Sequence, residues 1–314
     1  MTNYQSPNKH KFIFFSFSLF SSLIIGFWLL VIEVSAQSAI SLSITPPLTE
    51  IIIQPGKEVR QTYILQNGGG DTTLLPKMVY FTTSDDFGNV NLTEEAAPDW
   101  VKYSKDPINL KFEGQKTFSV SFNPPEDTPE TDHYFTLVFE SQTPVDLLSI
   151  TSTFYKSVIG SNILVTISKD GNPKKSAEIV KFEAPKIIDS MFGKINYKVI
   201  IKNNGNYYWK PVGKINIQNS DSIKIAPLNI LSGNNREISC LKNEELKSCE
   251  FDDFFLFGKI TSTLEFSLDE DPKIYKQSAT TIALPFGLII LLLILLTLVR
   301  IRGIFIFRVW GRKK

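Results

Sequence analysis

Residues 117–122 read TFSVSF, an alternation of polar and apolar side chains with a period of two. Successive side chains of a strand point to opposite faces, so this period predicts a β-strand with one buried face. Two later sets of apolar residues show the same alternation: Phe135, Leu137 and Phe139; Ile163, Val165 and Ile167. The first half of the chain is therefore predicted to consist of half-buried strands.

Polar turn clusters separate these strands at residues 54–57, 67–71 and 123–127. The connections are too short for a crossover helix, so antiparallel pairing is expected. About seven short strands in roughly 130 residues are typical of an immunoglobulin-like β-sandwich. We assign this first sandwich to residues 37–170.

A polar stretch, KDGNPKK at residues 169–175, has the composition of an interdomain linker. Beyond it the period of two returns, at residues 195–201 and 260–268. These strands predict a second immunoglobulin-like β-sandwich over residues 171–281. The predicted fold class is all-β, with two tandem sandwiches followed by a C-terminal transmembrane helix.

Both ends of the chain carry apolar segments. The uncharged run IALPFGLIILLLILLTLV, residues 282–299, would reach roughly 27 Å as a helix and is predicted to span a membrane. The basic residues 300–314 follow it, which predicts a cytoplasmic tail. Residues 1–36 are predicted to be an export signal peptide, with an uncleaved anchor as the alternative. The expected localisation is therefore the cell membrane, in a single-pass topology with both sandwiches extracellular and the C-terminus cytoplasmic.

The charge of the chain limits the classes of partner that it can bind, and its cysteines indicate the redox state of its compartment. Residues 37–281 carry more acidic than basic side chains, which argues against nucleic acid or another polyphosphate as the partner. Cys240 and Cys249 are the two cysteines, and an even number in an exported region predicts a disulfide. The alternative is a pair of unreactive thiols.

The sequence predicts no catalytic, cofactor or metal site. His133 is the one histidine outside the predicted signal, and one histidine with two cysteines cannot form the usual zinc sets. The acidic pairs Asp85–Asp86 and Asp252–Asp253 and the run Asp269–Asp271 offer oxygen ligands, but solvated turn charges explain them without calcium. A hydrolase that uses two converging carboxylates is the catalytic alternative.

Two groups of apolar residues are candidate binding surfaces. The rings of Tyr207, Tyr208 and Trp209 can stack on a sugar or anchor a protein, or they can pack in the core. The long connection 141–157 carries the second group, which either contacts a partner or folds back on its own sandwich. Its apolar residues are Val145, Leu147, Leu148, Ile150 and Phe154.

The order of these parts resembles that of the WxL-interacting proteins of Gram-positive cell surfaces. The similar segments are Pro46–Pro47, Pro55–Gly56, 85–90 (DDFGNV), 123–125 (NPP), 203–206 (NNGN) and 256–261 (LFGKIT). The resemblance implies a first domain that binds peptidoglycan, a second that binds a surface protein, and no catalysis. This chain departs from the family in the 141–157 connection, the cysteine pair and the lack of a glycine before Tyr134.

The predicted function is therefore a non-catalytic envelope-binding, adhesion or scaffold role at the cell surface, with a cell-wall polymer or a surface protein as the partner. The same turn motifs also suit other immunoglobulin-like surface proteins and the N-terminal lobe of pilus chaperones. A pilus-chaperone-like or other surface assembly factor is thus the alternative.

Overall fold

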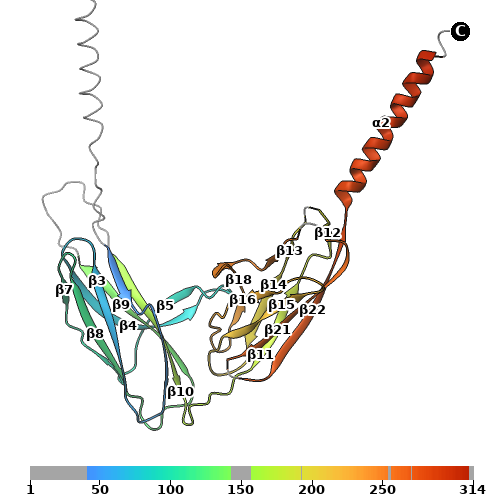
Figure 1. The fold of residues 1–314 in the computed structure, drawn as a ribbon. Coiled ribbons are helices and arrows are strands. Elements are labelled where there is room, and N and C mark those ends of the chain that lie inside the picture. The colour runs from blue at the N-terminus through green and yellow to red at the C-terminus, as the bar shows by residue number, and fades with distance from the viewer. Residues whose placement is uncertain (1–40, 143–156, 192, 254–255, 270, 311–314) are drawn as a thin grey trace, which may run out of the picture.

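The computed structural model describes residues 41–142, 157–191, 193–253, 256–269 and 271–310. The predicted signal peptide, residues 1–36, lies outside these ranges. The described strands form two β-sandwiches arranged as a V, and the predicted boundary after Asp170 falls between them (Figure 1). The prediction of an all-β protein with two sandwiches is confirmed.

The first sandwich contains ten described strands, whose bounds are β1 Leu42–Thr45, β2 Leu48–Ile53, β3 Val59–Asn67, β4 Thr72–Thr83, β5 Val90–Ala96, β6 Val101–Tyr103, β7 Ile108–Leu110, β8 Gln115–Phe122, β9 Asp132–Gln142 and β10 Val158–Ile167. One sheet has the order β1-β3-β8-β6. The other has the order β2-β10-β9-β4-β5, with β7 also paired to β4. The alternating apolar residues predicted from the sequence face inward between these sheets.

The second sandwich has strands β11 Ala177–Glu183, β12 Ile187–Asp189, β13 Ile195–Asn196, β14 Lys198–Asn203, β15 Pro211–Ile217, β16 Ile223–Ile225, β17 Asn235–Glu237, β18 Cys240–Lys242, β19 Glu245–Lys247, β20 Glu250–Phe251, β21 Gly258–Leu268 and β22 Ile274–Leu284. Its main sheet has the order β12-β22-β21-β15-β16-β18-β19 and faces a smaller sheet, β11-β14-β17. Strands β13 and β20 form a separate pair.

In each sandwich the first strand divides between the two sheets. In the first, β1 pairs antiparallel with β3, and after Pro46 and Pro47 the chain continues as β2, which pairs parallel with β10. In the second, β11 pairs with β14 and β12 pairs parallel with β22. The antiparallel pairing expected for the first sandwich is therefore wrong for β2 and β10, and the second sandwich contains a parallel pair as well. In each sandwich the second part of the divided first strand therefore pairs with the last strand.

The structure also corrects the predicted membrane span. Residues Ile282–Leu284 belong to β22, where they pair with β12 and β21, and Pro285 separates them from helix α2, Phe286–Trp310. The uncharged part of α2 then ends at Val299, about 21 Å from its start at about 1.5 Å per residue. Within the described ranges, no helix combines the length and the apolar character needed to cross a membrane. The predicted single-pass localisation is therefore wrong, and the basic residues assigned to a tail begin within α2.

Candidate functional site

The aromatic residues proposed as a binding surface lie mostly inside the protein. Trp209 is fully buried in the core of the second sandwich, and Tyr207 is also shielded from solvent but is not part of that core cluster. Trp209 exchanges backbone hydrogen bonds with Ile230, which holds its ring toward the core. Tyr208, on the other side of the chain, is partly buried between the two sandwiches. The three rings thus form no exposed patch, because the alternation of the backbone sends them to two different interiors.

The apolar residues of the other candidate surface, Val145, Leu147, Leu148, Ile150 and Phe154, lie outside the described residues. The backbone on either side of that connection is described. Ser141 N–H donates to Ser157 O at 2.9 Å, so β9 and β10 are already joined where the connection leaves and re-enters.

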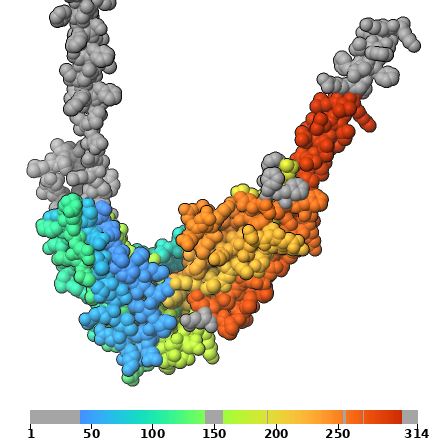
Figure 2. All heavy atoms as spheres, viewed as in Figure 1, coloured from blue at the N-terminus to red at the C-terminus, as the bar shows by residue number. Residues whose placement is uncertain are grey.

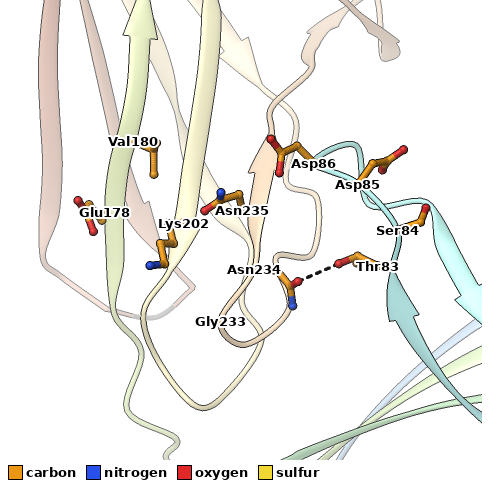
Figure 3. A pocket seen from close by; sticks show the side chains of 10 residues that line it. All are labelled: Thr83, Ser84, Asp85, Asp86, Glu178, Val180, Lys202, Gly233, Asn234 and Asn235. Atoms are coloured by element: carbon orange, nitrogen blue, oxygen red, sulfur yellow. Dashed lines mark hydrogen bonds between the residues drawn. The ribbon is translucent and has the colours of Figure 1, made fainter.

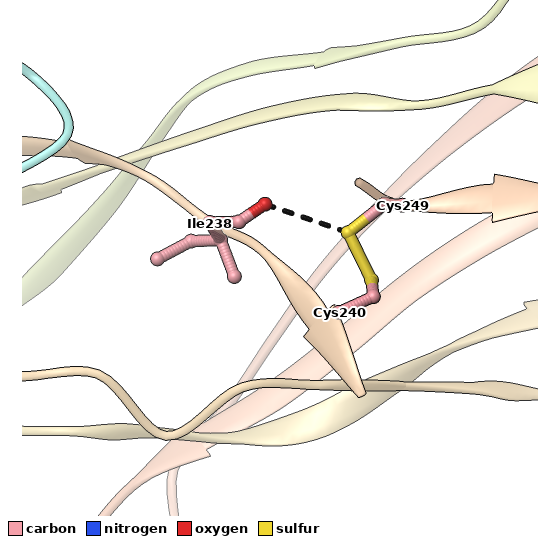
Figure 4. Close-up of a disulfide and its surroundings, with 3 residues drawn as sticks. All are labelled: Ile238, Cys240 and Cys249. Atoms are coloured by element: carbon pink, nitrogen blue, oxygen red, sulfur yellow. Dashed lines mark hydrogen bonds between the residues drawn. A yellow bond between two sulfur atoms is a disulfide. The ribbon is translucent and has the colours of Figure 1, made fainter. Parts of the chain in front are cut away.

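Cys240 and Cys249 form the disulfide that the sequence predicts (Figure 4). The bond joins β18 to the residue before β20, and both sulfur atoms are buried in the core of the second sandwich. Cys249 Sγ lies 3.4 Å from the carbonyl oxygen of Ile238. The bond therefore fixes the β18–β19 hairpin to the core and is a structural feature.

The acidic turns act as local structural anchors. Asp85 accepts hydrogen bonds from the N–H groups of Phe87 and Asn89 and from Asn89 Nδ2, and the Asn89 side chain lowers the pKa of this carboxyl. Asp252 lies beside Lys242 and Lys194, which lower its pKa. Among the described residues, no group of three or more histidine, cysteine, aspartate or glutamate side chains is placed to hold a metal ion. Neither carboxylate has the raised pKa of a general acid.

A polar hollow lies between the tip of the β4–β5 hairpin and the small sheet of the second sandwich (Figure 3). Thr83 Oγ1 donates to Asn234 Oδ1 at 2.9 Å across it, and Glu237 N–H donates to Asp86 O at 2.6 Å. The residues that line it are Thr83, Ser84, Asp85, Asp86, Glu178, Val180, Lys202, Gly233, Asn234 and Asn235. This hollow is a contact zone that joins the two sandwiches.

Three partly buried ionisable side chains begin β9: Asp132 and Tyr134 face the second sandwich, and His133 packs against rings of the first. Burial raises the pKa of Asp132, although hydrogen bonds from Thr166, Tyr208 and Tyr134 oppose the shift. Burial also raises the pKa of Tyr134 and lowers that of His133. The ring of His133 lies 5.3 Å from that of Trp100, and its Nε2 has no described hydrogen-bond partner. Sequence reasoning considered His133 only as a possible zinc ligand and did not single out Asp132.

The open edge of the second sheet is the remaining candidate site. Strand β2 pairs with β10 only from Asn162 onward, and the Ser161 side chain donates to Pro46 O, so residues Val158–Gly160 have a described neighbouring strand, β9, on one side alone. The side chain of Val158 is 52% exposed. Strand β1, which would continue β2 along this edge, has crossed to the other sheet. Sequence reasoning missed this site because it depends on which strand ends where.

Comparison with known proteins finds similarity to solved structures only at low sequence identity. No family model and no curated protein sequence matches the chain. Among solved structures, the class 5 fimbriae chaperone CfaA has 16% sequence identity and a TM-score of 0.40, and the match covers 76% of this chain and 99% of that chain. The YadV chaperone has 10% identity and a TM-score of 0.37, with coverages of 77% and 99%. The CsuC–CsuE chaperone–tip adhesion subunit complex of Acinetobacter baumannii has 11% identity and a TM-score of 0.35, again with 77% and 99% covered. Two of these proteins are named for fimbriae or pili, and the pilus chaperones are the alternative class named in the sequence analysis.

Proposed function

We propose that this protein is a non-catalytic assembly factor that binds an extended segment of a partner protein along the open edge of β10. The observation that carries the proposal is the uncovered stretch Val158–Gly160, where the backbone groups of Val158 and Gly160 face away from β9, the neighbouring strand described there. An exposed sheet edge can accept an additional strand, with main-chain hydrogen bonds providing affinity. The enzymatic alternative receives no support from the acidic turns described above.

The hydrogen-bond pattern identifies the groups that are free to pair. Asn162 N–H donates to Pro47 O, and Ser168 N–H donates to Ile53 O, so even-numbered residues of β10 direct their backbone groups toward β2. A strand alternates the direction of its backbone groups with a period of two. Val158 and Gly160 therefore point their N–H and C=O groups toward the open side, where no described strand pairs with them.

The corresponding edge in the second sandwich supplies a contrast. Strand β12 covers β22 only at Ile282–Leu284, so the preceding part of β22 is also uncovered by described strands. That edge carries Lys276 near its middle, which forms an ion pair with Glu265 at 2.7 Å. Lysine on an edge strand discourages pairing with other chains. The stretch Val158–Gly160 carries no charge, so the first sandwich keeps the edge better suited to binding.

The similar solved structures and the resemblance to WxL-interacting proteins both favour a protein as the partner. Two of the similar solved structures are complexes of a chaperone with a tip adhesin or a tip adhesion subunit. A protein partner agrees with the envelope, adhesion or scaffold role expected from the resemblance to WxL-interacting proteins. Peptidoglycan binding remains a prediction of that resemblance, and no described residue adds support for it.

A proline substitution tests the edge directly. Val158→Pro removes the outward N–H while leaving the ladder to β9 intact, because that ladder uses the odd-numbered residues of β10. Peptides selected on the wild-type protein from a displayed library of unstructured 12-residue sequences would serve as probes, with affinity measured by fluorescence anisotropy. We expect Val158→Pro to weaken binding at least about tenfold, from the loss of one or more backbone hydrogen bonds.

Ser278→Pro is the matched control. Its N–H points to the open side of β22 by the same parity, since Ile282 N–H donates to Lys186 O. We expect this variant to bind the selected peptides as the wild type does. Wild-type affinity in Val158→Pro, with an unchanged melting temperature, would contradict the proposal, as would equal losses in the two variants.

A further inference from the structure

The two sandwiches meet at a cluster of hydrogen bonds centred on Asp132, the first residue of β9. Its carboxylate accepts hydrogen bonds from Thr166 Oγ1 at 2.7 Å and from Tyr134 Oη at 2.8 Å, both in the first sandwich. It also accepts the backbone N–H of Tyr208, which belongs to the second sandwich. A single side chain thus connects the last two strands of one sandwich to the backbone of the other.

Tyr134 extends this connection to a second point. While its hydroxyl donates to Asp132, the same oxygen accepts the backbone N–H of Ser232 at 2.9 Å. The second sandwich therefore presents two backbone donors, Tyr208 N–H and Ser232 N–H, to one continuous network. Because backbone groups are fixed by the fold, two such bonds restrict rotation more than bonds to flexible side chains would.

An apolar cluster packs beside the network. Phe81 and Leu164 of the first sandwich and Leu231 of the second are buried against one another, with the rings of Tyr134 and Tyr208 at their border. Hydrogen bonds in such a partly dry environment are stronger than those in water, and a missing partner there is costlier. The network and the apolar cluster thus reinforce the same contact.

Two of the side-chain contacts between the sandwiches are less protected. Glu50 accepts hydrogen bonds from Lys210 Nζ and Asn229 Nδ2, but about a third of the Glu50 and Lys210 side chains is exposed, at 31% each. Exposed ion pairs of this kind contribute little to stability because solvent screens them. The contact of Thr83 with Asn234 borders the polar hollow shown in Figure 3.

We propose that Asp132 is the positioning residue that fixes the angle between the two sandwiches, and that the V visible in Figures 1 and 2 is a preformed, rigid shape. This proposal is independent of what binds at β10, since its residues and its test lie at the joint. It assigns a role to a carboxylate that neither the proposed binding edge nor the sequence motifs use.

Two substitutions of Asp132 test whether its hydrogen bonds fix the angle between the sandwiches. Asp132→Ala removes the acceptor and leaves three donors without it. Asp132→Asn is the matched control, because its amide oxygen can accept from Tyr134 and Tyr208 while its NH₂ group donates to the rotated hydroxyl of Thr166. We therefore expect Asp132→Asn to keep the angle and Asp132→Ala to lose it.

The distance between the two sandwiches is measured in the full chain by double electron–electron resonance. The spin labels are attached at Lys116→Cys and Lys214→Cys, which are exposed positions of the first and second sandwich. The native cysteines do not react, since they are joined in the disulfide. We expect one narrow distance distribution in the wild type and Asp132→Asn, and a broadened distribution in Asp132→Ala. Hydrogen exchange of the Tyr208 amide should accelerate at least about tenfold in Asp132→Ala alone.

Tyr134→Phe provides a second variant if Asp132→Ala does not fold. It removes the hydroxyl that receives the Ser232 N–H, so exchange of the Ser232 amide should accelerate while the core of the first sandwich is retained. Distance distributions of equal width in the wild type, Asp132→Ala and Tyr134→Phe would overturn the proposal. Broadening in Asp132→Asn equal to that in Asp132→Ala would also overturn it, since the hydrogen-bonding geometry would then not be the cause.

Discussion

Removing the disulfide should destabilise the second sandwich by an amount that the structure allows one to calculate. Cys240 and Cys249 are separated by nine positions, so the bond closes a loop of about ten residues. In the chain-entropy model such a loop restricts the unfolded state by about 2.7 kcal/mol at 25 °C. Both cysteines are buried, so the variant Cys240→Ala/Cys249→Ala also loses some apolar contact.

The expected change in melting temperature follows from the size of the domain. A domain of roughly 110 residues has an unfolding entropy of about 0.23 kcal/mol/K, so a loss of about 2.7 kcal/mol lowers its melting temperature by about 12 °C. Differential scanning calorimetry of the oxidised wild type and the double alanine variant measures this shift. Wild-type protein that is reduced while unfolded and refolded in reductant is the control, because it keeps both side chains and lacks only the bond.

A shift smaller than about 3 °C in both the variant and the reduced control would refute the reasoning. It would mean that the β18–β19 hairpin is already ordered in the unfolded ensemble, so that the bond restricts little. A large shift in the alanine variant with none in the reduced control would assign the effect to packing around the two side chains. Counting thiols in denatured, unreduced protein establishes the oxidation state in each case.

Two further variants test a buried side chain in each sandwich. Trp209→Ala should lower the free energy of unfolding by about 3–5 kcal/mol, measured by urea denaturation, because the ring is fully buried in the second sandwich; an effect below about 1 kcal/mol would contradict that burial. His133→Phe should reduce the loss of stability on acidification. Burial lowers the pKa of His133 in the folded state, so the unfolded state takes up a proton first as the pH falls below about 6.5. The free energy of unfolding of the wild type therefore decreases from that pH down to the lowered pKa of the folded state, and the phenylalanine variant lacks this decrease. Identical pH profiles for the two proteins between pH 7.5 and 5 would contradict this assignment.

The strands and the core were predictable from the sequence because their signal is local. The alternation of Phe118, Val120 and Phe122 with serines indicates a strand with one buried face, and the structure buries these three residues. The disulfide followed from the number of cysteines. Both predictions need only neighbouring residues or a count.

The open edge and the joint depend on contacts between distant segments, which a single sequence does not reveal. Nothing near Val158 indicates that β1 leaves its sheet more than a hundred residues earlier, at Pro46. Asp132 begins a strand like many other polar residues, and only the backbone of Tyr208 gives it a role. The apolar run from Ile282 was misassigned for a related reason: an unbroken apolar sequence does not show that its first residues pair as a strand.

The divided first strand has a consequence for folding during synthesis. Ser161 Oγ donates to the carbonyl oxygen of Pro46, 115 residues earlier in the chain. Strand β1, the first half of the divided strand, can pair with β3 soon after both leave the ribosome. Strand β2, the second half, can pair only after β10, the last strand of the same sandwich, has been synthesised. Pairings of such high sequence separation form late and slow the folding of β-proteins. A nascent chain that ends before residue 167 therefore has an incomplete sheet with an unprotected edge, and it is in this interval, rather than after release, that the first sandwich is most exposed to aggregation and proteolysis.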